Sequence, residues 1–162
     1  MTKPLAGRSF LETFGLTLLA IAALFVADTF LARTERAETM VEAAREFEQG
    51  RVLMQRGKNA EAIERIKDAI ANARGNRDYR RLLAQAQFAA GRIADAETTL
   101  TELLQSDSTD GLSSLTMGRV LVGEGRFEEA ISYFHRAIDG RWNQDPAGNR
   151  LRVRFELVEL LA

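Results

Sequence analysis

The sequence predicts an all-α protein: a single N-terminal transmembrane helix, then an α-solenoid of three repeats, and one further helix. Three observations support this fold class. The 162 residues include only two prolines and twelve glycines, and helix-forming residues dominate the chain. A long apolar run lies near the N-terminus. Beyond that run, residues of the same kind recur every 34 positions.

The apolar run covers residues 10–31, after a short tail at residues 1–9, and its charges are Glu12 and Asp28. At 1.5 Å per residue the run would form about 33 Å of helix, which matches a bilayer core of about 30 Å. Both charges lie near its ends, where they cost less than at the bilayer centre. Ser9 and Glu12 also have the spacing of a capping box. We predict a transmembrane helix from Phe10 to Leu31 that contacts the lipid bilayer.

Two alternatives compete with an uncleaved anchor: a cleaved signal peptide and a buried helix. Cleavage after the small-x-small site Ala20-Ile21-Ala22 would leave residues 24–26, Leu-Phe-Val, exposed at the new N-terminus. A partly buried helix would carry polar residues on one face, which residues 16–27 lack apart from Thr17. The pattern therefore favours an anchor. The basic leader favours an N-in orientation, which places the repeats in the bacterial periplasm, although basic residues flank both ends.

The linker at residues 32–42 has strong helix propensity and contains neither Pro nor Gly. It could join the membrane helix to the first repeat as one continuous helix. Alternatively, Thr39 and Glu42 could begin a separate helix with a second capping box.

Five sets of positions recur with the 34-residue spacing: Gly57, Gly91 and Gly125; Ala62, Ala96 and Ala130; Gly50, Ala84 and Gly118; Ile66, Leu100 and Phe134; and Ile70, Leu104 and Ile138. Each unit is predicted to be a first helix, a glycine turn and a second helix. Small residues let the two helices approach, and glycine permits a positive φ in the turn. The large apolar residues fill the space between units, so three stacked units would share one core.

This pattern resembles the tetratricopeptide repeat (TPR) family, whose motif positions are matched by Gly118, Gly125, Ala130 and Phe134. The matched repeats are residues 43–76, 77–110 and 111–150, so that 43–150 is the repeat region. The first two repeats depart from the family at Gln49 and Gln87, where it prefers apolar residues, and lack its terminal proline. The resemblance implies a right-handed superhelix whose concave groove binds peptides or partner domains.

A connection at residues 140–145 precedes a last helix, for which Asp145 is the predicted N-cap and Pro146 the first residue. In this connection Trp142 is either an interface anchor or packs against the preceding helix. Residues 151–162 resemble the first helix of a fourth repeat without its second helix. Their unpaired apolar surface indicates self-association, docking on a partner, or a continuation of the protein.

The composition argues against several kinds of chemistry. The chain has no Cys, one His and a formal charge of −1, which speaks against thiol chemistry, a metal site and nucleic-acid binding. His135 is interpreted as a surface residue. No glycine-rich phosphate loop is present. We therefore expect no catalytic residue, no cofactor, no metal and no small-molecule substrate, and predict that the protein is not an enzyme.

The TPR resemblance implies a partner-binding groove lined by the first helix of each repeat. Mapped onto this sequence, the groove residues are Phe47, Arg51, Met54, Arg81, Gln85, Phe88, Leu115, Arg119 and Val122. The arginines could pair with a carboxylate of an apolar segment, or serve only in solubility or ion pairs within one helix. The family's clamp for chaperone tails has Lys and Asn at these positions. Its replacement by Arg puts binding of such tails in doubt.

Together these features predict a non-enzymatic, membrane-anchored TPR scaffold that binds protein partners beside the bilayer. Its role would be assembly or stabilisation of a membrane protein complex, and its partners would be the subunits or their peptide segments. One alternative is a permanent accessory subunit of a larger membrane complex. Another is a receptor or chaperone associated with protein import or a translocon.

Overall fold

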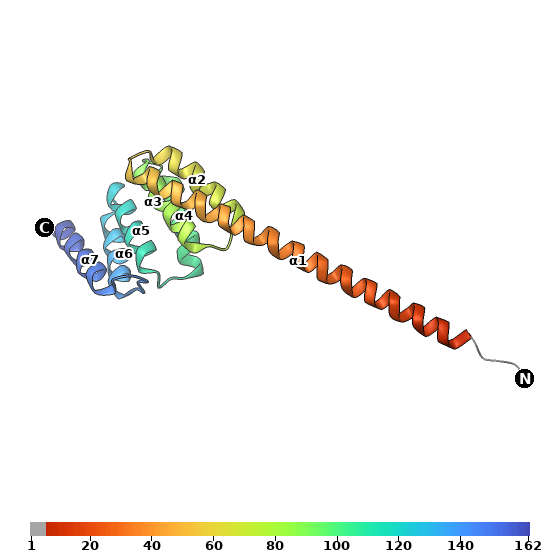
Figure 1. Cartoon of the computed structure of the whole chain (residues 1–162). Coiled ribbons are helices and arrows are strands. Elements are labelled where there is room, and N and C mark those ends of the chain that lie inside the picture. Colours follow the sequence, from red (N-terminus) through yellow and green to blue (C-terminus); the bar gives the residue numbers. More distant parts are fainter. Residues whose placement is uncertain (1–5) are drawn as a thin grey trace, which may run out of the picture. The chain divides into compact units, whose positions relative to one another are not determined.

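The computed structural model describes the backbone of residues 6–162 and the side chains of residues 14–19, 21–26, 29, 30 and 32–162. Its regular elements are all α-helices, and the chain divides into two compact units, Met1–Val41 and Glu42–Ala162. The helices are α1 (Ala6–Gln55), α2 (Asn59–Asn72), α3 (Arg77–Ala89), α4 (Ile93–Ser106), α5 (Gly111–Gly123), α6 (Phe127–Asp139) and α7 (Pro146–Leu161) (Figure 1).

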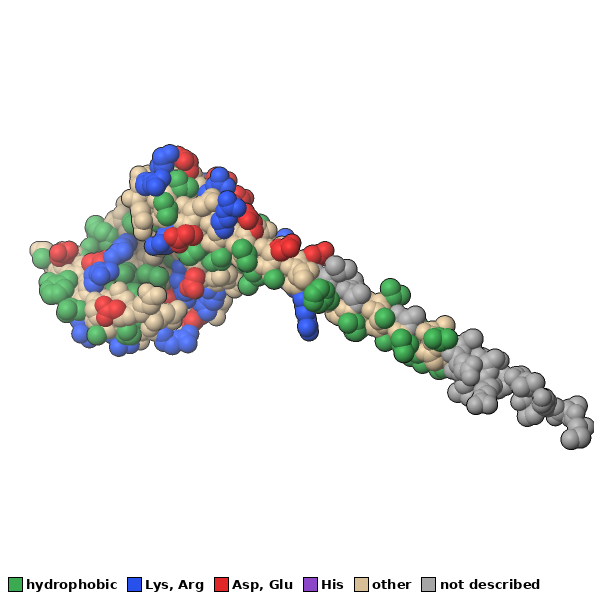
Figure 2. Space-filling model, viewed as in Figure 1, with side chains coloured by type: hydrophobic (Ala, Val, Ile, Leu, Met, Phe, Trp, Pro, Cys, Tyr) green, Lys and Arg blue, Asp and Glu red, His purple; other side chains and the backbone are tan. Residues whose placement is uncertain are grey.

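The first unit carries large apolar side chains at its surface (Figure 2). Leu24 and Phe25, for example, are 71% and 69% exposed. Among the residues described, no helix is both long and apolar enough to cross a membrane, so the predicted span at residues 10–31 is not confirmed. Glu12 and Asp28 were predicted to lie near the ends of this span, and their side chains are outside the described part of the chain. Helix α1 begins at Ala6, so Ser9 lies inside the helix and the prediction that it is the N-cap is wrong.

The linker at residues 32–42 is helical and belongs to α1 without a break. Thr39 does not cap a new helix, because its Oγ1 donates a hydrogen bond of 2.9 Å to the carbonyl oxygen of Arg36 in the preceding turn. The alternative of a separate helix beginning at Thr39 is therefore wrong.

The second unit is an all-α solenoid in which each helix from α2 to α7 packs against the next in the chain. The end of α1 packs on α2, as the contact between Gly50 and Ile66 shows. The helices form the pairs α1–α2, α3–α4 and α5–α6, followed by α7 (Figure 1). This arrangement confirms the predicted all-α repeat architecture.

The three predicted glycine turns have the same backbone geometry. Gly57, Gly91 and Gly125 have φ angles of 72°, 72° and 73°, in the left-handed region that glycine adopts without a steric penalty. Each following residue donates to the carbonyl five residues earlier, for instance Arg92 N–H to the Gln87 oxygen at 2.8 Å. This is the Schellman pattern, which ends a helix and satisfies its last carbonyl groups.

Small residues in the first helix of each repeat admit a large side chain from the second. A Cβ added at Gly118 would lie 2.9 Å from Cε1 of Phe134, and one added at Gly50 would lie 2.6 Å from Cγ1 of Ile66. Ala84, at the corresponding position, is fully buried in the same cluster as Leu100. These pairs confirm the predicted packing role of the recurring small and large positions.

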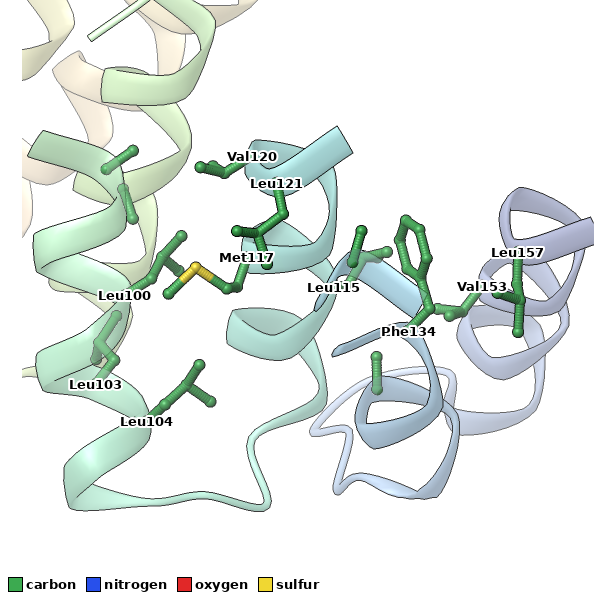
Figure 3. Packing of buried hydrophobic residues seen from close by; sticks show 14 residues of the cluster. Leu100, Leu103, Leu104, Leu115, Met117, Val120, Leu121, Phe134, Val153 and Leu157 are labelled. Carbon is green, nitrogen blue, oxygen red and sulfur yellow. The ribbon is translucent and has the colours of Figure 1, made fainter. Parts of the chain in front are cut away.

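The larger core cluster lies between α3 and α7 and joins successive repeats. Leu100 and Leu104 of α4 face the α5 side chains of the cluster, which are Met117, Val120 and Leu121 (Figure 3). Phe134 lies between α5 and α7, where Val153 and Leu157 complete the cluster (Figure 3). The core is therefore shared across repeat boundaries, as expected when single repeats cannot bury their own apolar faces.

The connection between α6 and α7 is fixed by Trp142. Its Nε1 donates to the carbonyl oxygen of Ala137 at 2.9 Å, and its ring lies so close to Gly111 that a Cβ there would be 2.5 Å away. Trp142 is half-buried, so it packs the connection against the preceding helix. Helix α7 then begins at Pro146 with Asp145 as its N-cap, as predicted, and includes residues 146–150.

Candidate functional site

One face of α3, α5 and α7 carries two cavities. Residues seven apart on a helix share a face, and three such pairs line the two cavities: Arg81 and Phe88, Leu112 and Arg119, and Asn149 and Glu156. The first member of each pair lies nearer the start of its helix. We call the cavity lined by the first members the amino-end cavity and the cavity lined by the second members the carboxyl-end cavity. The two cavities together are called the groove.

The amino-end cavity has a volume of about 470 Å³. Its lining residues come from α1, α3, α5 with its N-cap, the connection after α6, and α7: Phe47, Asp78, Arg81, Asp110, Leu112, Arg141, Trp142, Asn143, Gln144 and Asn149. Phe47 is held there by stacking on Tyr79, with ring centroids 4.5 Å apart. Most of the other side chains are polar, so this end of the groove favours a polar or charged ligand group.

The carboxyl-end cavity has a volume of about 490 Å³ and is more apolar. It is lined by Phe88, Arg119, Val122, Gly123, Phe134, Glu156, Glu159 and Leu160. Phe88, Val122 and Leu160 are only partly buried by the core they pack against. Their remaining apolar surface is therefore free to bury apolar side chains of a ligand.

A larger cavity of about 760 Å³ lies between α1 and α2, outside the groove. Apart from Val52 and Leu53, its lining is polar or charged and includes Glu61, Glu64 and Arg65. Its greater volume does not make it the better candidate, because a charged, open surface at the edge of a solenoid is also what a capping face requires.

The guanidinium group of Arg81 is already paired inside the groove. Its Nε lies 2.6 Å from Oδ2 of Asp110, and Nη1 also contacts Asp78. The same Asp110 oxygen accepts a hydrogen bond of 2.7 Å from Ser113 Oγ. Burial alone would lower the pKa of Arg81, but the hydrogen bond and charge of Asp110 outweigh it and raise the pKa. Arg81 therefore remains charged, with its charge balanced by its own chain.

Arg119 is paired in the same way at the other end of the groove. Its Nε and Nη2 donate to the two carboxylate oxygens of Glu156 at 2.8 and 2.5 Å. The hydrogen bond with Glu156 raises the pKa of Arg119. Because Glu156 belongs to α7, the last helix supplies the counter-charge for a groove arginine of the third repeat.

Of the nine predicted groove residues, Phe47, Arg81, Phe88, Arg119 and Val122 line the two cavities.

The other four lie elsewhere. Arg51 is exposed and pairs with Glu48 at 2.6 Å, which is the ion pair within one helix given above as the alternative to ligand binding. Leu115 is 3% exposed and belongs to the core. Met54 packs against the core cluster of α2, and Gln85 is half-buried.

The sequence did not indicate the contribution of α7. Glu156, Glu159 and Leu160 line the carboxyl-end cavity, but the groove was mapped only from the first helices of three repeats. The resemblance of residues 151–162 to the first helix of a fourth repeat was the signal that could have found them.

His135 is exposed on α6. In the described part of the chain, no three His, Asp or Glu side chains are grouped so that they could hold a metal ion.

Comparison with known proteins identifies the repeat. Residues 47–111 match the tetratricopeptide repeat family. No curated protein matches the sequence.

Several solved structures share the fold. The Arabidopsis OM64 TPR domain is 18% identical with a TM-score of 0.63, over 75% of this chain and 98% of that one. The first TPR of Spaghetti (RPAP3), bound to the HSP90 peptide SRMEEVD, is 19% identical with a TM-score of 0.64, over 75% and 92%. The Sgt2 TPR domain from Aspergillus fumigatus is 17% identical with a TM-score of 0.58, over 73% and 80%.

Proposed function

This chain is a tetratricopeptide repeat protein, and we propose that it is a non-enzymatic scaffold that binds a protein segment in the groove of α3, α5 and α7. TPR folds typically serve protein–protein interaction, and one structural neighbour holds a peptide. The observation that carries the proposal is the apolar surface left open by Phe88, Val122 and Leu160 at the carboxyl-end cavity.

The ligand we propose is an apolar segment and not an acidic tail. Every arginine that lines the described groove is already paired with a carboxylate: Arg81 with Asp110, Arg119 with Glu156 and Arg141 with Asp107. A ligand carboxylate would have to displace one of these partners. Glu159 lines the groove and forms no ion pair among the described residues, so a basic group beside the apolar anchors would be favoured.

The test compares two valines in the full-length chain. Val122→Asp places a charge in the carboxyl-end cavity, whereas Val41→Asp places one on an exposed helical surface outside the second unit. Affinity purification in mild detergent followed by mass spectrometry should recover a partner with the wild type and Val41→Asp but not with Val122→Asp. Equal recovery by both variants would overturn the assignment of the groove, provided that circular dichroism shows both to be folded.

We further propose that residues 10–31 attach the protein to a membrane, with the groove on the periplasmic side of a bacterial inner membrane. The support is the sequence: a 22-residue run with charges only near its ends. Attachment would keep the groove beside its target in two dimensions, so modest affinity would suffice. A chain lacking residues 1–32 should leave the membrane fraction and remain folded. If it stays in the membrane fraction, residues 10–31 are not the anchor.

The cellular role we favour is assembly or stabilisation of a membrane protein complex. A permanent accessory subunit would copurify with its complex in equal amounts, whereas an assembly factor would be recovered in smaller amount. A receptor or chaperone of protein import or of a translocon would instead be recovered with unfolded client proteins. Quantitative mass spectrometry of the same purification distinguishes the three.

A further inference from the structure

Helix α7 has a second apolar face that the solenoid does not cover. Val153 and Leu157 are buried against the core, with exposed fractions of 0% and 7%. Leu151, Phe155 and Val158 are 52%, 62% and 64% exposed. Their spacing of four and then three residues places them in one stripe along the helix. Figure 2 shows hydrophobic side chains at the surface near the C-terminal end of the molecule.

Charges of opposite sign lie on one flank of this stripe. Arg152 and Glu159 are seven residues apart, so they share a flank of the helix, with Arg152 nearer its start and Glu159 nearer its end. Both side chains are exposed, and the described structure contains no ion pair or hydrogen bond for either. The opposite flank carries Arg154, which is also exposed.

We propose that the α7 stripe is the contact surface for a second copy of this chain, packed antiparallel about a two-fold axis at Phe155. Such an axis places Phe155 against its counterpart and Leu151 next to Val158 of the second copy. The same axis places Arg152 opposite Glu159 of the second copy. The axis position that suits the apolar pair and the one that suits the charged pair differ by one residue, about 1.5 Å along the helix. An axis of this kind brings like flanks together, so the ion pair between Arg152 and Glu159 forms twice, once on each side of the axis.

The charges disfavour the other symmetric arrangement, a parallel pair of α7 helices. In a parallel pair, each flank would face the opposite flank of the second copy, and Arg152 would lie beside Arg154 with no acidic partner. An unrelated partner would have no reason to match a pattern that is complementary to itself about one point. A second copy is therefore the occupant that the charge pattern selects. Because one helix face is a small interface, we expect dissociation in about the micromolar range.

Cysteine crosslinking tests the orientation, because the chain contains no cysteine of its own. Full-length chains carrying Leu151→Cys and Val158→Cys, one with a larger tag, are mixed in detergent and oxidised. The antiparallel pair predicts a disulfide between the two different chains. Each variant alone is the control: identical positions would lie about 9 to 12 Å apart along the axis, too far for a disulfide. Crosslinking mainly within one variant would overturn the arrangement.

Charge reversal tests the interface itself. Sedimentation of the full-length protein should show that Arg152→Glu weakens dimerisation about tenfold, and that Arg152→Glu combined with Glu159→Arg restores it to within about threefold. Val158→Asp should weaken dimerisation, whereas Val41→Asp should not. A wild type that is monomeric at about 100 μM, or a double variant that does not recover, would overturn the proposal. So would a dimer that Val158→Asp leaves intact, which would show that the copies meet elsewhere.

Discussion

Arg119 of α5 and Glu156 of α7 form a bidentate ion pair across the groove, with Nε–Oε2 and Nη2–Oε1 distances of 2.8 and 2.5 Å. Both side chains keep some exposure, 39% and 25%. The pair links the last helix to the third repeat and also neutralises the arginine that an acidic ligand would need. It therefore sets both the position of α7 and the ligand preference of the carboxyl-end cavity.

Removing the carboxylate should change that preference. Glu156→Gln frees Arg119, and we expect the affinity for a short acidic probe peptide to rise about threefold to tenfold relative to the wild type. Fluorescence anisotropy with the labelled peptide measures this. Glu159→Gln is the matched control, because it removes a charge from the same cavity and leaves the pair between Arg119 and Glu156 intact. Equal gains by both variants would show that overall charge, and not release of Arg119, governs binding.

The ion pairs of the groove could not be predicted from the sequence. The spacing of Arg81 and Arg119 predicted one shared helical face, and both side chains line the cavities of the groove. It could not show that Asp110 and Glu156 lie beside them, because these carboxylates are 29 and 37 residues away and lie outside the helices that carry the arginines. A periodic pattern predicts which face a residue occupies, whereas its partner depends on how the helices stack.

The helices and turns were more accessible to prediction, because their signals are local. Glycine at a fixed place in each repeat follows from one backbone requirement, and Asp145–Pro146 is a complete helix start within two residues. The role of Gln87, however, could not be predicted from local signals. It departs from the family pattern, yet it is buried, 6% exposed, and accepts a hydrogen bond of 2.9 Å from Thr99 Oγ1. A polar residue thus replaces an apolar one because a neighbouring helix supplies its partner.

The turn glycines should be sensitive to substitution although they have free space around them. Gly91→Ala should lower the free energy of unfolding by about 1 kcal/mol, because alanine is strained at the φ of 72° found there. Gly75→Ala is the control: this glycine also has nothing within 4 Å of an added Cβ, but it lacks the positive φ. Urea unfolding compares the two. A similar loss in both variants would mean that the conformation at Gly91 is not the cause.

The packing glycine of the third repeat should respond to volume and not to backbone strain. Gly118→Val adds three carbon atoms at a position where a Cβ alone would lie 2.9 Å from Phe134 Cε1. We therefore expect a loss of about 1–3 kcal/mol in the free energy of unfolding. At Gly123 a Cβ would meet only Phe88 at 3.8 Å, and Gly123→Val should cost less. Adding Phe134→Leu to Gly118→Val should recover part of the loss. If it adds a full further loss instead, the two residues do not compete for the same space.

Asp107 should make the stability of the repeat junction depend on pH. Hydrogen bonds from Thr109, together with the charges of Arg141 and Arg77, lower its pKa from 3.8 to about 2. The folded protein therefore favours the ionised carboxylate. Its stabilising contribution is complete above about pH 4 and is lost as the pH falls towards about 2.

Asp107→Asn removes that titration, so its free energy of unfolding should fall less steeply than that of the wild type between about pH 4.5 and about pH 2.5. Urea unfolding at a series of pH values measures both curves. Asp68→Asn is the control, because Asp68 is exposed and lies in α2, away from this junction. Parallel curves for the wild type and Asp107→Asn would show that the contacts from Arg77, Arg141 and Thr109 do not favour the ionised form, and that acid destabilises the solenoid at other carboxylates.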